Sequence, residues 1–271
     1  MRIPMNSFPA SSLPSLLTAI SQYITSPFLL DLLKYLALVL LAKIIPRTIP
    51  LRHRPIPSYD PDLDHPYLDN EQVLATDMLL GLTAIALPIL LTSLFSTPDS
   101  QHPHITVSAA HHSLTTYIFS ATLNELTTDT LKYTVRRLRP NFYAMTCHNL
   151  PVPSACPHYE YRLEQAYKSF PSGHASISFT AATLLTLHFL SRQTTHHPTS
   201  PTHRYLPPLT FYFIATSIAA SRVVDHWHNP SDVLAGAIIG TASALTGRWF
   251  MHRNLVVTGR YNDAKGGVKN S

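Results

Sequence analysis

The sequence predicts an all-α fold in which six helices cross a membrane as one bundle. Charged residues make up 13% of the 271-residue chain and apolar residues 45%, whereas a soluble domain carries about 25% charged residues. The mean hydropathy is +0.05. Six apolar stretches reach or approach the length of about 20 residues that a helix needs to cross a bilayer core. A bilayer is therefore the expected solvent for most of the chain.

Composition also excludes several other classes of protein. So little charge argues against a disordered chain, a coiled coil or an ordinary soluble enzyme. With 8 glycines and 23 prolines, the chain is neither collagen-like nor a glycine-rich linker. The net charge of +5 is too small and too dispersed to indicate a nucleic-acid partner. Two cysteines are too few for a disulfide scaffold or a structural zinc site.

The six predicted spans differ in strength. The first carries Asp31 and Lys34 three residues apart, a spacing at which the two charges can pair. The second is strongly apolar and contains one acid, Asp77. The third is rich in Thr, Ser and His, so hydropathy alone leaves open whether it crosses the membrane. In chain order the spans are 27–45, 73–95, 105–123, 175–190, 209–224 and 233–250.

Three regions follow from these spans, and no internal repeat is visible. Residues 1–26 form an N-terminal segment without the compact apolar core of a signal peptide, in which 13–24 could form a helix lying in the membrane interface. Residues 27–251 form the six-helix membrane domain. Residues 252–271 end in a polar, glycine-containing stretch and are expected to be a disordered tail.

The first of three polar clusters begins after the third predicted span. Lys132 and Arg139 are seven residues apart, about two helical turns, so that both side chains point to one face before Pro140 ends the helix. A cytosolic basic flank that obeys the positive-inside rule would look the same.

The second cluster precedes the fourth predicted span. Backbone N–H groups at Ser172, Gly173 and the first helical turn form a ready anion site, and His174 adds a proton donor. The alternative is a capped helix start with an incidental histidine, since the chain has 16 of them.

The third cluster lies between the fifth and sixth predicted spans. His228 and Asp232 are four residues apart, so that the carboxylate could accept from one ring nitrogen and leave the lone pair of the other free to attack. Arg222 adds a planar guanidinium that suits phosphate. The alternative is a capped helix start with a surface histidine.

Alternation of six spans brings all three clusters to the same side of the membrane. Cations, two histidines and a carboxylate at one place fit an oxyanion-rich group that one histidine attacks and the other protonates. Phosphoryl transfer has these requirements. The chain has neither a phosphate-binding P-loop motif nor an acidic metal-binding cluster, so the cations would take the role of a metal.

These motifs resemble those of the type 2 phosphatidate phosphatase superfamily, the lipid phosphate phosphatases. They are Lys132-x6-Arg139-Pro140, Pro171-Ser172-Gly173-His174 and Ser221-Arg222-x5-His228-x3-Asp232, and the resemblance covers residues 59–250. It implies the six-helix bundle of the phosphatidate phosphatase and haloperoxidase type, without a metal or cofactor.

The resemblance also implies a role for each motif residue. His228 would be the nucleophile that forms a phosphohistidine, Asp232 would orient it, and His174 would be the acid and base. The phosphate would be bound by Lys132, Arg139, Ser172, Gly173 and Arg222. His226 is a rival nucleophile, but the spacing from Arg222 and Asp232 selects His228. Many relatives have Gly where this chain has Arg136, whose role the sequence leaves open.

The expected function is hydrolysis of phosphate from phosphatidate, diacylglycerol pyrophosphate, lysophosphatidate or similar lipids. Alternatives are a polyisoprenyl or terpenyl diphosphate phosphatase, a non-catalytic lipid-binding membrane protein and a vanadate-dependent peroxidase, of which the last is disfavoured because such relatives are soluble. The expected location is an endomembrane or the plasma membrane, with no nucleic-acid partner and an oligomeric state that the sequence does not reveal.

The side of the membrane is predicted from the basic residues outside the motifs. By a thin margin they place the termini in the cytosol and the active site on the luminal or extracellular face, as the family also implies. Cys147 and Cys156 lie in the loop that carries the site, where they could form a disulfide or remain two thiols.

Overall fold

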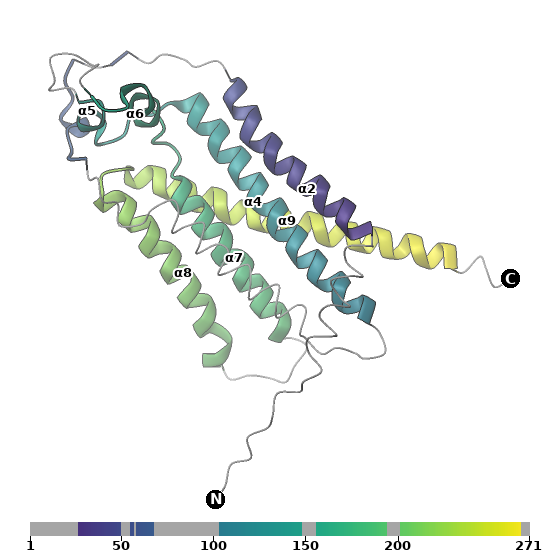
Figure 1. Cartoon of the computed structure of the whole chain (residues 1–271). Helices are drawn as coiled ribbons and strands as arrows, with labels where there is room; N and C mark the ends of the chain where they lie inside the picture. The colour runs from purple at the N-terminus through teal and green to yellow at the C-terminus, as the bar shows by residue number, and fades with distance from the viewer. Residues whose placement is uncertain are drawn as a thin grey trace, which may run out of the picture.

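The structure is a computed structural model that describes residues 27–49, 55–56, 58–67, 103–147, 156–193 and 201–266. Within these ranges it contains helices and two short 3-10 turns but no strand, which confirms the all-α class (Figure 1). The long helices are α2 (Pro27–Ile44), α4 (Pro103–Val135), α7 (Gly173–Gln193), α8 (Pro201–Val224) and α9 (Pro230–Gly266). The short elements are α5 (Phe142–Met145), α6 (Tyr159–Ala166), η1 (Ile45–Thr48) and η2 (Pro61–Leu63).

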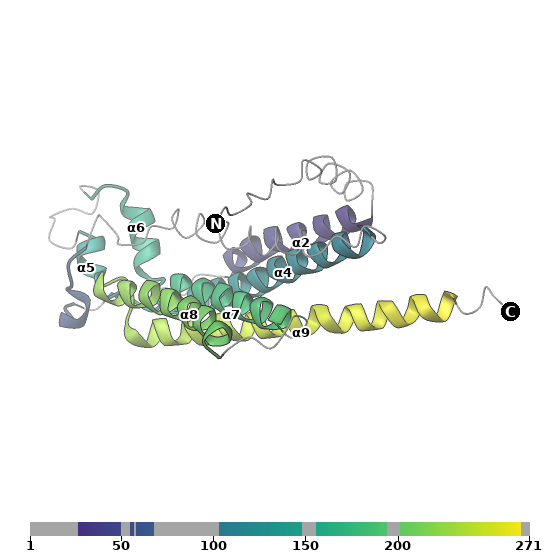
Figure 2. The ribbon, with the colours of Figure 1, turned by 90° about the horizontal axis from the view of Figure 1, so that it is seen from below.

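The long helices pack around α7. Helix α7 contacts α4, α8 and α9, and α2 packs against α4. Figure 1 shows α2, α4, α7 and α8 running side by side with α9 crossing behind them. In the view from below, α9 extends well past the other helices (Figure 2). The short helices α5 and α6 lie together at one end of the bundle.

Several helices are longer than the predicted spans. Helix α4 continues to Val135, because its polar second half packs on α7, where the Thr128 hydroxyl donates to Ser176 at 3.3 Å. Helix α8 begins at Pro201 and contains Pro207 and Pro208. The backbone of α9 is helical to Gly266, where the sequence predicts a disordered tail from residue 252. The predicted span 73–95 and the N-terminal segment lie outside the described residues.

Among the described helices, one is long and apolar enough to cross a membrane by length and composition, the Pro230–Arg253 part of α9. The six-span count therefore stays a prediction.

Side chains are distributed over the bundle in the reverse of a soluble protein. The buried positions of the helices carry mainly small and hydroxyl-bearing residues, such as Ser120, Thr180 and Ala244. Many of these hydroxyls donate within their own helices; for example, Ser120 donates to the Thr116 carbonyl at 2.8 Å. Large apolar side chains face outward instead, with Phe213 72% and Leu234 64% exposed. Such a surface suits a surrounding of lipid.

Two glycines allow α9 to approach α7 closely. Gly236 and Gly240 are four residues apart and share one face of α9. A Cβ atom at Gly236 would lie 2.5 Å from the Ser172 carbonyl oxygen, and one at Gly240 would lie 2.0 Å from the Ser176 carbonyl oxygen. Small residues at this spacing are typical of closely packed membrane helices. They fix the register of α9 along α7.

A compact apolar cluster lies outside the long helices, and we call it the cap. Its buried members come from residues 58–67 and from the segment around α5 and α6: Leu63, Phe142, Tyr143, Met145, Ala166 and Tyr167. A disulfide joins Cys147 to Cys156, with their Cα atoms 5.7 Å apart. The His65 amide donates to the Pro140 carbonyl at 3.1 Å. The cap thereby holds the segment that follows α4, which carries Arg139.

Candidate active site

The three predicted clusters meet at the capped end of the bundle. The Lys132 ammonium lies 3.1 Å from the place that a Cβ atom on Gly173 would occupy. The charges of Arg222, Arg139 and Lys132 all act on the His174 ring, as does His228. The end of α4, the start of α7 and the segment between α8 and α9 therefore contribute to one site.

His228 is held in a single tautomer. The chain turns sharply after α8, with His226 in the left-handed region (φ 57°), and the amides of Trp227 and His228 both donate to the Arg222 carbonyl, at 3.0 and 3.1 Å. The Nδ1 atom of His228 lies 2.6 Å from the Ser169 carbonyl oxygen. Because a carbonyl can only accept, Nδ1 carries the proton and Nε2 keeps its lone pair.

Asp232 is fully buried and makes three short contacts. Its carboxylate accepts from the Ser169 hydroxyl at 2.6 Å, from Arg137 Nη1 at 2.7 Å and from the Asn229 amide at 2.9 Å. The last of these caps the start of α9, where Pro230 is the first helical residue. The His228 Nδ1 atom is 3.9 Å from this carboxylate. Spacing predicted a direct His228–Asp232 hydrogen bond, but the nearer acceptor is the Ser169 carbonyl.

Two of the predicted phosphate-binding cations are buried and fixed in place. Arg222 is fully buried and donates through Nη2 to Asp225 at 2.8 Å. Arg139 donates through Nε to the Gln165 carbonyl at 2.9 Å, and its guanidinium stacks over the Trp227 ring at 4.6 Å. Rigid cations of this kind stabilise charge on a ligand without reorganising.

The start of α7 is braced from two sides. The Ser172 hydroxyl accepts from the Ala175 amide at 3.4 Å, as a helix cap does. The Ser172 amide donates to the Asp232 carbonyl at 3.0 Å. Since that amide is already engaged, Ser172 supports the anion site by shaping the helix start. Gly173 follows it and faces the Lys132 ammonium, which also contacts Asp129 at 3.3 Å.

Both histidines are neutral at pH 7. Burial, followed by the nearby positive charges of Arg222 and its neighbours, lowers the pKa of His174 to about 3. Burial likewise lowers the pKa of His228 to about 4, against the opposing effect of Asp232. The His174 Nε2 atom is buried and has no hydrogen-bond partner among the described atoms. It is therefore available to a ligand in the site.

Sequence reasoning missed two residues that hold His228 and Asp232 in place. Arg137 lies in the basic cluster that the sequence singled out, so its contact with Asp232 could have been suspected. Ser169 contributes both a carbonyl to His228 and a hydroxyl to Asp232, and no motif signals the carbonyl contact. The rival His226 stacks on the His65 ring at 4.4 Å, while His228 is only 4% exposed.

Arg136 occupies a backbone position that favours glycine. Its φ of 48° places it in the left-handed region directly after the end of α4. The side chain is buried and its guanidinium stacks over the Tyr167 ring at 4.7 Å. Arg136 thus packs on the cap. Within the described ranges, no group of three or more His, Cys, Asp or Glu side chains could hold a metal ion.

Comparisons with known proteins point to one family. The family model of the PAP2 superfamily matches residues 113–255. A Drosophila melanogaster protein named "Putative phosphatidate phosphatase" is 37% identical over 147 residues, 48% of this chain and 38% of the relative. Lipid phosphate phosphatase 1 of Arabidopsis thaliana is 29% identical over 198 residues, 68% of this chain and 55% of the relative. Phospholipid phosphatase 2 of Mus musculus is 30% identical over 149 residues, 51% of this chain and 52% of the relative.

The chain thus spans about half the length of the curated relatives it matches. No solved structure matches the chain significantly. The matched region begins in α4 and ends in α9, so it contains all three clusters of the site. The family match covers more than half of the chain, and the chain belongs to the PAP2 superfamily, the type 2 phosphatidate phosphatases.

Proposed function

We propose that the chain is a lipid phosphate phosphatase that works without a metal through a phosphohistidine on His228. One observation carries the proposal: Nδ1 of His228 is held by the Ser169 carbonyl at 2.6 Å, which leaves the Nε2 lone pair for attack in a site lined with cations. A neutral imidazole beside buried guanidinium groups has the nucleophile and the charge stabilisation that phosphoryl transfer needs.

In the first step, Nε2 of His228 attacks the phosphorus atom in line with the bond to the lipid oxygen. The N–P bond forms as the P–O bond breaks, and protonated His174 gives its proton to the leaving oxygen. The phosphorylated ring keeps its Nδ1 proton and becomes positively charged. The Ser169 carbonyl accepts a hydrogen bond from the Nδ1–H group, and the Asp232 carboxylate, 3.9 Å from Nδ1, stabilises the positive charge.

In the second step, water attacks the phosphohistidine. His174, now neutral, takes the proton from the water as the N–P bond breaks. Inorganic phosphate leaves, and His228 returns to its starting form with the lone pair on Nε2. Lys132, Arg139 and Arg222 would bind the phosphate oxygens in both steps, with the Gly173 amide at the start of α7, which Ser172 shapes.

His174 acquires its proton together with the substrate. Its pKa is about 3, chiefly because of burial and then because of the surrounding positive charges. A bound phosphate ester brings negative charge among those cations and offsets their repulsion. A monoester has a second pKa of about 6, so part of the substrate arrives with a proton that can move to His174.

A lipid is the expected substrate. The relatives named above are a phosphatidate phosphatase, a lipid phosphate phosphatase and a phospholipid phosphatase by name. The outward-facing Leu and Phe side chains of the bundle favour a surrounding of lipid. Phosphatidate, lysophosphatidate and diacylglycerol pyrophosphate are the first candidates. A panel that adds polyisoprenyl diphosphates to these lipids, assayed with purified protein, decides between the two substrate classes.

We also propose six spans in an endomembrane or the plasma membrane, with the site on the luminal or extracellular face. The Cys147–Cys156 disulfide lies in the cap beside the site and favours an oxidising compartment. In sealed vesicles, a membrane-impermeant thiol reagent after mild reduction should label both cysteines from the luminal side only. Labelling from the cytosolic side would reverse the orientation.

Phosphate release from phosphatidate by the purified full chain tests the function. His228→Ala should lower the rate by several orders of magnitude, while His226→Ala, in the same turn, should stay near the wild-type rate. Acid-labile, alkali-stable label on the protein from 32P-phosphatidate should appear in the wild type and in His226→Ala but not in His228→Ala. Equal release by wild type and His228→Ala would remove the proposed nucleophile, and loss of activity with EDTA would contradict the metal-free mechanism.

A further inference from the structure

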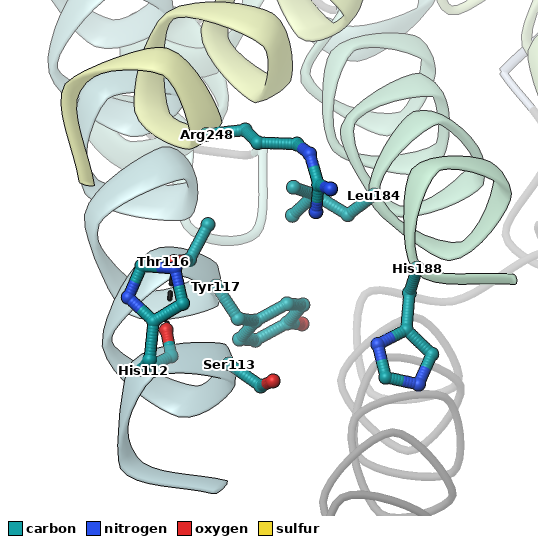
Figure 3. Close-up of a pocket in the computed structure, with 7 residues that line it drawn as sticks. All are labelled: His112, Ser113, Thr116, Tyr117, Leu184, His188 and Arg248. Atoms are coloured by element: carbon teal, nitrogen blue, oxygen red, sulfur yellow. Dashed lines mark hydrogen bonds between the residues drawn. The ribbon is translucent and has the colours of Figure 1, made fainter. Parts of the chain in front are cut away.

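A second polar pocket lies far from the active site, between α4, α7 and α9. Tyr117 and Ser113 of α4, Leu184 and His188 of α7, and Arg248 of α9 contribute to its lining, and it encloses about 40 Å³. Figure 3 shows the Arg248 side chain reaching from α9 into the space between the other two helices.

All three helices place this pocket at the opposite end of the bundle. At a rise of about 1.5 Å per residue, Arg248 is about 24 Å along α9 from Asp232, and Tyr117 is about 22 Å along α4 from Lys132. On α7, His188 is about 21 Å from His174. These separations approach the roughly 30 Å thickness of a bilayer core. With the active site at one membrane surface, the pocket lies near the other.

The charge of the pocket is positive. None of its lining residues is acidic, and Arg248 carries a permanent positive charge. Arg248 also belongs to the one described helix that is apolar enough to cross a membrane. Arg248 is exposed and lies near the end of that helix, and basic pockets between helices near a membrane surface suit anionic lipid head groups.

We propose that this pocket binds the phosphate group of an anionic phospholipid in the leaflet opposite the active site. The inference goes beyond the proposed phosphatase function and shares with it only the membrane placement. The guanidinium of Arg248 can hold two phosphate oxygens at once. The Tyr117 hydroxyl on α4 borders the same space and adds a donor.

The size of the pocket fits this ligand. A buried water needs about 10–15 Å³ by the same measure, so about 40 Å³ accommodates a single tetrahedral oxyanion or about three waters. Free phosphate has the same chemistry as a lipid phosphate. A lipid also has acyl chains, which can pack on the outer surface around Leu245 and Trp249, where the side chains are apolar and exposed. Free phosphate cannot make this contact.

The test uses the full chain in detergent and phosphatidylglycerol as the probe. Phosphatidylglycerol is a phosphodiester, which a phosphomonoesterase does not consume. Native mass spectrometry should detect one tightly retained lipid per wild-type chain. Arg248→Gln should bind it at least about tenfold more weakly, the size expected for loss of one charge-assisted contact. Tyr117→Phe should weaken binding less.

Arg253→Gln is the matched control. It removes the same charge from the same helix, but Arg253 stacks on the Trp249 ring at 4.8 Å and does not line the pocket. It should bind phosphatidylglycerol as the wild type does. Both variants should keep the phosphatase activity, which shows that they fold. A wild type without phosphatase activity would refute the proposed function and leave the lipid-binding result intact.

A second arm replaces the lipid with inorganic phosphate. If phosphate stabilises the wild type more than Arg248→Gln, the pocket takes free phosphate as well. If wild type and Arg248→Gln differ in their binding of phosphatidylglycerol but not of phosphate, the ligand is a lipid headgroup. Equal binding of both probes by wild type and Arg248→Gln would overturn the proposal. An equal loss in Arg253→Gln would also overturn it, because it would show non-specific attraction to α9.

Discussion

Acidification should destabilise this protein through His228. The ring lies between α8 and α9, outside the predicted spans, and is only 4% exposed. Burial lowers its pKa from 6.5 to about 4 in the folded chain. The unfolded chain therefore binds a proton more readily than the folded chain does. The contribution of the neutral His228 ring to the free energy of unfolding is therefore complete above pH 6.5, and it is lost as the pH falls from 6.5 toward 4.

The magnitude follows from these two pKa values. Each pH unit between the two pKa values changes the free energy of unfolding by about 1.4 kcal/mol, so the full loss is about 3 kcal/mol. Between pH 7 and pH 5 the loss attributable to His228 is about 2 kcal/mol. For a domain of this size, 2 kcal/mol corresponds to about 4–8 °C in Tm.

The assay is Tm of the purified full chain in detergent between pH 7 and pH 5. His228→Gln removes this titration, so its Tm should fall by about 4–8 °C less than that of the wild type. The fall in Tm that remains in His228→Gln comes from His174 and other titrating groups. His226→Gln, in the same turn but more exposed, should fall more than His228→Gln does and only slightly less than the wild type, because burial also lowers the pKa of His226. If wild type and His228→Gln lose the same Tm, the ring of His228 is not buried in its neutral form.

Three further variants test other contacts. Ser169→Ala removes the 2.6 Å hydrogen bond to the buried Asp232 carboxylate. Because a hydrogen bond to a charged group contributes about 1.5–3 kcal/mol, this variant should lower kcat about 10–100-fold with little change in KM. Ser120 is equally buried but donates to a neutral carbonyl, so Ser120→Ala is the control and should keep the wild-type kcat. Gly240→Ala would place a Cβ 2.0 Å from a carbonyl oxygen of α7 and should destabilise the chain by about 1–3 kcal/mol; an unchanged Tm would contradict the close packing. At Arg136, with its φ of 48°, the Ala variant should be about 1 kcal/mol less stable than the Gly variant, and equal Tm values would refute a left-handed backbone there.

Much of the site was predictable because its residues lie at helix ends. A sequence pattern reveals where apolar helices begin and end, and alternation then brings those ends to the same side. Lys132 and Gly173 are 41 positions apart in the chain, yet a Cβ on Gly173 would lie 3.1 Å from the Lys132 ammonium. The convergence thus follows from topology, and the cation and histidine types are those that the proposed phosphoryl transfer needs.

The remaining features depend on contacts that residue types do not encode. Every residue has a carbonyl, so only the folded path of the loop before α7 reveals that the Ser169 carbonyl holds His228. The length of α4 is a similar case. Hydropathy ends the third predicted span at residue 123, but burial of Thr128 and its bond to Ser176 keep the helix intact to Val135. Tertiary packing outweighed local polarity there.

The packing of α9 on α7 and the geometry of the site are parts of the same contact. Lipid provides no hydrophobic force between helices, so their association relies on close van der Waals packing. Gly236 allows that approach at the Ser172 carbonyl, and the Ser172 amide bonds to the Asp232 carbonyl at 3.0 Å. A side chain at Gly236 would push α9 away from α7 and draw Asp232 from the Ser169 hydroxyl. The geometry around Asp232 therefore depends on Gly236, a residue outside the site.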